Sequence, residues 1–235
     1  MSTFEEAVRE WTRPINGQYP RPWMSTMKDP TKATTFIVGR NQATPFPVEL
    51  VGSQETFLDA IFNRNGQGHA ALYERVRARM GKGPSPTRSN VERLTALLER
   101  HGVRGVLETN VICYSSPMSA DLQNADSSGG KEAGMRVFTA LLHAIRPRVI
   151  IAHGTATRFD LEKIVGTSLP KPPQGPLDEV ALTEVALPGG ASERRTLVFV
   201  IPALAPPGWN KWSSWAPSYL EKLARRAAKH TPERG

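Results

Sequence analysis

Three polar side chains follow short apolar runs of this chain, at positions where they can do chemistry. Asn41 comes after the run at residues 35–38 (TFIV), Asn110 lies near the end of residues 103–111 (VRGVLETNV), and His153 follows residues 148–152 (RVIIA). An asparagine amide offers one carbonyl acceptor and two donors, so it can hold a water or face a base. A histidine can donate a hydrogen bond or a proton near neutral pH. Together these residue types can bind a base and position a water.

Two further segments have a composition that suits contact with DNA. The last apolar run, residues 196–201 (TLVFVI), leads into PALAPPGWNKWSSW, where aromatic and basic residues alternate. Such segments contact unstacked bases and phosphates. Leu204 is a candidate wedge for a vacated base stack, and Trp209 and Lys211 are candidate DNA contacts; the alternative is that the tryptophans pack the final helix onto the sheet. In residues 81–88 (GKGPSPTR), Ser85 and Arg88 are candidate phosphate contacts or simply solvated loop residues.

The elements that position these residues read as an α/β fold. The four apolar runs are brief, rich in Val, Ile and Leu, and not strictly alternating, as in strands buried on both faces of a parallel sheet. Helical patterns at residues 90–101, 132–145, 159–164 and 218–229 fall between or after them. We therefore expect an α/β/α sandwich around a four-stranded, mainly parallel sheet. Ligands of such sheets bind beyond the carboxyl ends of the strands, where the polar residues lie.

Length and composition predict one domain with a polyanionic partner. The 235 residues, 39% hydrophobic, fit a single domain 1–235 with an N-terminal helical extension, residues 1–30, and a Pro-rich loop, residues 168–177. Thirty basic side chains against 22 acidic ones give a charge of +8, which favours a polyanion such as nucleic acid or an anionic membrane surface. A single cysteine, Cys113, allows no internal disulfide and no four-thiolate site. We expect a cytoplasmic monomer without metal, cofactor, membrane or obligate protein partner.

The order of these motifs resembles the uracil-DNA glycosylase superfamily, nearest to its mismatch-specific and single-strand-selective branches. The carriers are Gly39-Arg40-Asn41 with a loop containing Pro and Phe46, then "ETN", "PRVIIAHG" and "FVIPALAPPGWNKW". The resemblance implies that Asn41 orients the attacking water and that Asn110 hydrogen-bonds a flipped base. It places Gly39 and Phe46 among the base-binding residues, and it implies that the loop after residue 201 enters the minor groove.

The chain departs from the family pattern at two catalytic positions. Position 41 is Asn where other branches have a water-activating carboxylate, and Ala203 stands where the last motif often has a His. The cysteine count excludes the iron–sulfur branches. His153 is a candidate replacement for the missing His, or a structural residue. Alternatives also stand for Asn41 (a turn residue), for Asn110 (a strand-end cap) and for Phe46 (a core residue).

The expected activity is that of a monofunctional DNA glycosylase, a hydrolase that flips and excises a modified base and leaves an abasic site. The altered motifs are similar to those of prokaryotic glycosylases that remove modified cytosine from phage DNA as antiviral defence. One alternative is a repair glycosylase for uracil or another deaminated base. Another is a catalytically silent relative that binds DNA or a nucleotide.

Overall fold

The structure describes residues 3–66, 68–116, 119–124, 127–187 and 195–231. Within these ranges, five strands form one mostly parallel sheet. The sheet order is β2-β1-β3-β5-β4 in this computed structural model. Both β1 and β5 run parallel to β3, with Thr35 opposite Val149 and Val149 opposite Leu197. The strands are β1 (Thr35–Gln42), β2 (Val106–Ser115), β3 (Val149–His153), β4 (Leu182–Ala186) and β5 (Arg195–Ile201).

The expectation of four strands is wrong, because β4 forms a fifth. This strand pairs antiparallel with β5, with Leu182 opposite Phe199. Of its five residues only Val185 is buried, so it lacks the continuous apolar run that marks a strand buried on both faces. The α/β class is confirmed, with helices flanking a mainly parallel sheet.

The chain divides into two compact units, each built from three segments. Unit 1 contains Met1–Thr31, Asn41–Gly83 and Leu107–Ala144, and unit 2 contains Lys32–Arg40, Pro84–Val106 and Ile145–Gly235. The boundary passes between Arg40 and Asn41, near the end of β1. The predicted site residues are therefore described unit by unit.

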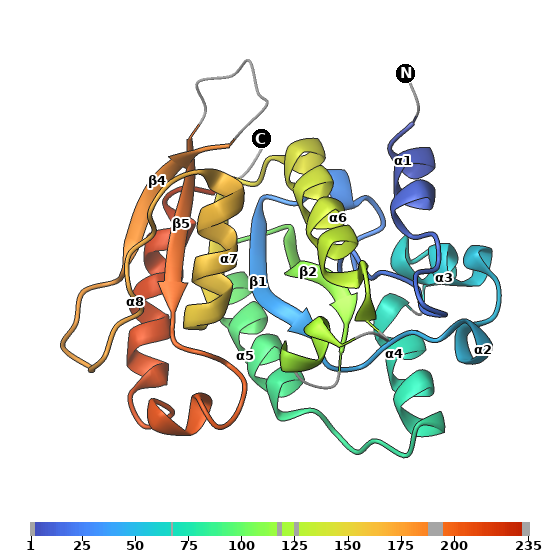
Figure 1. Ribbon diagram of the computed structural model, residues 1–235. Coiled ribbons are helices and arrows are strands. Elements are labelled where there is room, and N and C mark those ends of the chain that lie inside the picture. Colours follow the sequence, from blue (N-terminus) through green and yellow to red (C-terminus); the bar gives the residue numbers. More distant parts are fainter. Residues whose placement is uncertain (1–2, 67, 117–118, 125–126, 188–194, 232–235) are drawn as a thin grey trace. The chain divides into compact units, whose positions relative to one another are not determined.

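Unit 2 has a layer of helices on each side of its strands (Figure 1). Helices α5 (Pro86–Arg100) and α8 (Ala216–Ala228) share one buried core with alternate residues of the strands, among them Ile37, Ile151 and Phe199. Helix α7 (Thr155–Val165) contacts β3 and lies in front of the strands in Figure 1, while α8 lies behind β4 and β5. Successive side chains of a strand point to opposite faces of the sheet, so each strand packs one face against the helices on each side.

Two of these helices begin earlier than their periodicity indicates. Helix α5 begins at Pro86 rather than at residue 90, because the Ser85 side chain accepts a hydrogen bond from the Arg88 backbone N–H and proline fits the first helical position. Helix α7 begins directly after Gly154, whose φ of +93° strongly favours glycine. This tight turn brings the start of α7 to the carboxyl end of β3.

Unit 1 packs its helices around β2 and an aromatic core. The predicted N-terminal extension is helical only at α1 (Phe4–Trp11), where Thr3 and Glu6 form a capping box. The chain then runs beside β2, with Met24 bridged to Glu108. The remaining elements are α2 (Val48–Val51), α3 (Gln54–Ile61), α4 (Gly68–Arg79), η2 (Ser119–Gln123) and α6 (Gly130–Ile145), with η1 (Pro30–Lys32) between α1 and β1.

Helix α6 lies unusually close to β2, and two glycines make this possible. A Cβ atom at Gly134 would lie 2.9 Å from the backbone nitrogen of Cys113, and one at Gly130 would lie 2.5 Å from the Tyr114 ring. No larger residue fits either position without moving the helix. None of the helices in the described ranges is long and apolar enough to cross a membrane.

Candidate functional site

Asn41 lies near the end of β1, where its side chain is held by the chain that follows β2. Its Nδ2 donates a hydrogen bond of 2.9 Å to Oγ of Ser116. The backbone joins the same two segments, since the Ser116 N–H donates to the carbonyl of Gln42 over 3.0 Å. Because Nδ2 is directed at Ser116, the carbonyl oxygen Oδ1 points in another direction. The amide therefore has a defined rotation, which a water-orienting group needs.

A buried hydrogen-bond network fixes the loop that leaves β1. Gln42 donates through Nε2 to the carbonyl of Arg21 over 2.7 Å. Ser115 donates to Oε1 of Gln42 (3.2 Å) and to the carbonyl of Thr44 (3.0 Å). All four residues are buried, so these bonds form in a low-dielectric interior and resist exchange with water. The loop after Asn41 is thus part of the rigid scaffold of unit 1.

Asn110 lies inside β2 rather than at its end, because the strand continues to Ser115. The strand-end position predicted for it is wrong, and so is the cap alternative. The side chain is 8% exposed, and no described residue hydrogen-bonds its amide. A nearly buried polar group without a protein partner is costly unless water or a ligand satisfies it. The Asn110 amide therefore has hydrogen-bonding capacity that no described residue uses.

Phe46 is part of an aromatic cluster and not an exposed platform. Its side chain is fully buried, edge-on to Phe57 and His69 and stacked with Tyr73 at 6.4 Å. The Arg21 guanidinium lies over the ring, 5.1 Å from its centroid. This is the core position that the sequence left open as an alternative. A base can stack on this ring only if these neighbours move.

His153, the last residue of β3, is half-buried in unit 2 and is held as a neutral ring. Burial lowers its pKa to about 4. The backbone N–H of Leu204 points at Nδ1 from 3.5 Å, which makes Nδ1 the acceptor and leaves the proton on Nε2. A neutral imidazole with a proton on Nε2 is a hydrogen-bond donor near pH 7.

Leu204 belongs to the core, so its interpretation as an exposed wedge is wrong. The side chain is fully buried among residues of α5, β5 and α8. Its backbone carbonyl accepts a hydrogen bond of 2.8 Å from Nδ2 of Asn90, which is itself buried. Leu204, three positions after the end of β5, therefore holds the loop against α5. That role also aims the Leu204 N–H at His153.

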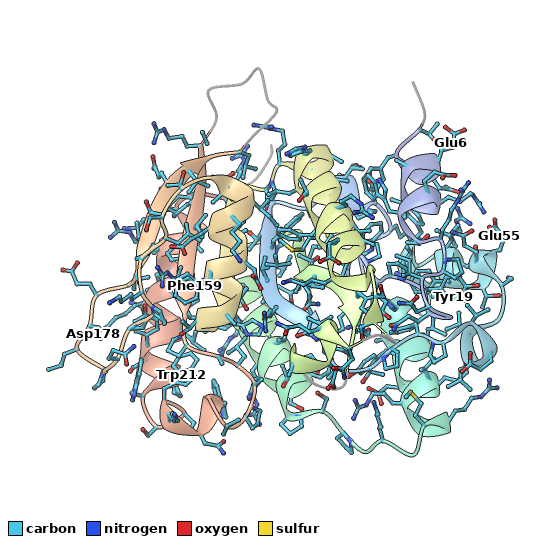
Figure 2. All side chains as sticks on the ribbon, viewed as in Figure 1. Glu6, Tyr19, Glu55, Phe159, Asp178 and Trp212 are labelled. Atoms are coloured by element: carbon cyan, nitrogen blue, oxygen red, sulfur yellow. The ribbon has the colours of Figure 1, made fainter. Side chains whose placement is uncertain are left out.

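The tryptophans after β5 form a continuous edge-to-face series. Ring centroids are 5.2 Å apart between Trp209 and Trp212 and 5.3 Å apart between Trp212 and Trp215. Trp212 is buried beside α8 (Figure 2) and donates from Nε1 to the carbonyl of Ala203 over 2.9 Å. This confirms the packing alternative for Trp212. Trp209 is half-buried in the short helix η4 (Trp209–Lys211), and Lys211 is exposed.

Two residues predicted as loop contacts to phosphate belong to the start of α5. Ser85 is the N-terminal cap, and Arg88 pairs through Nε with Oε1 of Glu92 at 2.9 Å. The Arg88 side chain is only 17% exposed, and its Nε is directed at Glu92, one turn further along the helix. Both residues have structural roles here, and their contact with phosphate stays a prediction.

The glycine and arginine that precede Asn41 belong to unit 2. Gly39 is buried within β1. Arg40 donates through Nε to the buried carboxylate of Asp160 on α7 over 2.9 Å. A buried charge needs a partner, so this pair holds the end of β1 to α7.

Cys113 is a fully buried free thiol. Burial raises the pKa of the Cys113 thiol to about 12, so it is not a reactive thiolate. In the ranges that the structure describes, no three His, Cys, Asp or Glu side chains are grouped as metal ligands.

Comparison with protein-family models and with curated proteins gives no match for this chain. The function therefore has to be argued from the residues themselves.

The structure places Asn41, Phe46 and Asn110 in unit 1, and the remaining predicted site residues in unit 2. Sequence reasoning missed Ser116, which holds Asn41 from 75 positions away along the chain. It also missed Arg77 of α4, which is buried next to the loop after Asn41. The position of Ser116 directly after β2 is a signal that would have found it, since strand ends carry the site in such sheets.

Proposed function

We propose that this protein is a monofunctional DNA glycosylase that hydrolyses the N-glycosidic bond of a flipped, modified base. The observation that carries the proposal is the pair of amides in unit 1. Asn41 is held in one rotation by Ser116, and the Asn110 amide is nearly buried with no hydrogen-bond partner among the described residues. One suits a fixed water and the other suits the hydrogen-bonding edge of a base. The motif order that resembles the uracil-DNA glycosylase superfamily supports the same assignment.

The reaction assigns a separate task to each amide. Oδ1 of Asn41 accepts a hydrogen bond from the attacking water, whose oxygen forms a bond to C1′ of the sugar. The C1′–N bond breaks and its electron pair leaves with the base, while a proton of the water passes to solvent. An amide is a poor proton acceptor, so Asn41 orients the water and does not act as a general base.

Asn110 of unit 1 would read the base, and the resemblance makes His153 of unit 2 a candidate donor to a leaving base. The Asn110 amide can face O4 and N3–H of uracil or, rotated, the N4–H and N3 edge of cytosine. His153 is neutral with its proton on Nε2, so it can donate a hydrogen bond to an oxygen or nitrogen that gains negative charge. No proton transfer from His153 is needed for this role.

The basic surface of unit 2 supports DNA as the partner. Lys211 is exposed at the turn that precedes α8, and the exposed residues of α8 and its end include Lys222, Arg225, Arg226 and Lys229. Of these, Arg225 is paired with Glu221 at 3.4 Å. An exposed cluster of this sign attracts a polyanion and neutralises phosphates on contact.

For the substrate we propose a modified cytosine, with a role in defence against phage DNA. This part rests on the resemblance to prokaryotic glycosylases and on the altered catalytic positions, Asn41 and Ala203. Uracil or another deaminated base is the competing substrate. A silent DNA-binding relative is the outcome if no base is released.

The test is an excision assay on matched single strands and duplexes. Each carries uracil, 5-hydroxymethylcytosine, glucosylated 5-hydroxymethylcytosine or only normal bases, and abasic sites are detected by alkaline cleavage. Asn41→Ala should abolish release while leaving DNA affinity within a few fold, because only the water's orientation is lost. Asn124→Ala, an exposed asparagine of the same unit, is the control and should behave as the wild type. Release of no base by the wild-type protein would refute the proposal.

A further inference from the structure

Arg77 is a buried cation next to the loop that follows Asn41. It lies on α4 and is 8% exposed. Its Nη1 donates to Oγ1 of Thr44 over 3.0 Å and to the hydroxyl of Tyr73 over 3.1 Å. The guanidinium also lies over the Tyr73 ring, 5.3 Å from the centroid. These contacts fix the position of the group but are all to neutral partners.

Within the described ranges of the chain, no carboxylate pairs with Arg77. Its Nε is buried without a hydrogen-bond partner, and Nη2 takes part in neither of the two bonds above. A guanidinium cannot lose its proton to escape the cost of burial. A buried charge without a counter-charge destabilises the folded state, and a bound anion can supply that counter-charge.

Other positive charges lie around the same loop. The Arg21 guanidinium lies over two aromatic rings, 5.4 Å from the centroid of Tyr73 and 5.1 Å from that of Phe46. Nζ of Lys82 is 3.4 Å from the carbonyl of Ala43, and both burial and the charge of Arg77 lower the pKa of Lys82. Such a concentration of cations attracts an anion to this part of unit 1.

The loop connects this cluster to the proposed water-orienting residue. Thr44, which accepts the bond from Arg77, also accepts at its carbonyl from Ser115. Ser116, the next residue, holds Asn41. Arg77 is thus connected to Asn41 through Thr44, the adjacent residues Ser115 and Ser116, and the part-buried hydrogen bond between Ser116 and Asn41.

We propose that Arg77 and Lys82 form a binding site for a DNA backbone phosphate adjacent to the flipped nucleotide. This inference rests on the proposed function, because it names how that site holds its substrate. A guanidinium with an unused Nη2 matches the oxygens of a phosphate, and a lysine adds a mobile point charge. A phosphate held there would fix the nucleotide backbone relative to the loop that follows Asn41.

The first test uses inorganic phosphate and thermal unfolding of the full chain. Phosphate should raise the Tm of the wild type in a concentration-dependent way and raise that of Arg77→Met much less. In the absence of phosphate, Arg77→Met should have a Tm equal to or above the wild type, because it removes an uncompensated buried charge. Arg75→Met, an exposed arginine of the same helix, is the control and should respond as the wild type does.

The second test uses duplexes with a tetrahydrofuran abasic analogue and one neutral methylphosphonate, moved through the positions that flank the analogue. At one position the substitution should weaken binding by the wild type about 10- to 100-fold, the usual effect of losing hydrogen bonds to a charged group. At that position it should weaken binding by Arg77→Met by less than about threefold. Lys82→Gln, which changes a less buried residue, should lie between the two and serves if Arg77→Met does not fold.

Two results would overturn the inference. One is that phosphate stabilises Arg77→Met and Lys82→Gln as much as the wild type. The other is that the methylphosphonate scan has the same profile in the wild type and in both variants. Either result alongside normal base excision removes the phosphate site but keeps the glycosylase. A phosphate response that depends on Arg77, in a protein that excises no base, supports the anion site and refutes the proposed function.

Discussion

The neutral state of His153 predicts that stability falls on acidification. Burial lowers the pKa of the ring from its ordinary value of 6.5 to about 4. Between these two pH values the unfolded chain binds a proton that the folded protein does not. The free energy of unfolding is therefore at its full value above pH 6.5, decreases as the pH falls toward 4, and changes no further from this group below pH 4.

The magnitude follows from the size of that shift. At about 1.4 kcal/mol for each tenfold change in proton affinity, His153 contributes at most about 3.5 kcal/mol of lost stability. The ring is half-buried and solvent reduces the effect, so we expect about 1–3 kcal/mol. The Leu204 N–H directed at Nδ1 acts in the same direction, since it is compatible only with an unprotonated Nδ1.

The assay is urea unfolding of the wild type and His153→Gln at several pH values from 7 to 4. The variant has no ring to protonate at this position. As the pH falls from 7 to 4, the free energy of unfolding of the wild type should therefore decrease by about 1–3 kcal/mol more than that of the variant. His143→Gln, which removes an exposed histidine, is the control and should show no comparable change. Parallel curves for the wild type and His153→Gln would refute the reasoning that the ring is held neutral.

Four further changes test other parts of the structure. Leu204→Ala should destabilise the protein by about 2–5 kcal/mol in denaturant unfolding, because it leaves a cavity in the core; a loss below 1 kcal/mol would contradict that placement. Gly134→Ala should lower the Tm, since its Cβ meets the β2 backbone. Asn110→Asp should change base preference in the excision assay more than DNA affinity; an unchanged profile would exclude Asn110 from base reading. Lys211→Ala should reduce the salt dependence of duplex binding by about 0.9 in the log–log slope, whatever the sequence.

Local pattern predicted the buried strands well and the half-exposed one not at all. The cores of β1, β3 and β5 are near-continuous apolar runs, which few other elements produce. Strand β4 has a single buried residue and depends on pairing with β5, so its own sequence carries little signal. Apolar periodicity places the start of α5 too late, because Ser85 and Pro86 stand in a segment rich in Gly and Pro, although both are favoured at a helix N-terminus.

The sequence predicts a candidate site residue only where a polar residue follows an apolar run, because that pattern marks the end of a buried strand. Asn41 and His153 were found in this way, and both lie at or near strand ends. The hydrogen bond from Asn41 to Ser116 and that from Arg77 to Thr44 join residues 75 and 33 positions apart. Nothing local encodes such pairs, so they appear only once the chain is folded. Burial of Leu204 and Phe46 was hidden for the same reason.

The interleaving of the two units has a consequence for the order in which the protein is made. All segments of unit 1 have been synthesised once the ribosome reaches Ala144, whereas unit 2 waits for its final segment, Ile145–Gly235. Thr35 of β1 pairs with Val149, which is added 114 positions later, roughly 6–20 s at ordinary rates of translation. Until then the apolar residues 36–38 have no partner strand β3. During that interval the nascent chain leaves this hydrophobic segment without one of the two strands that flank it in the finished sheet.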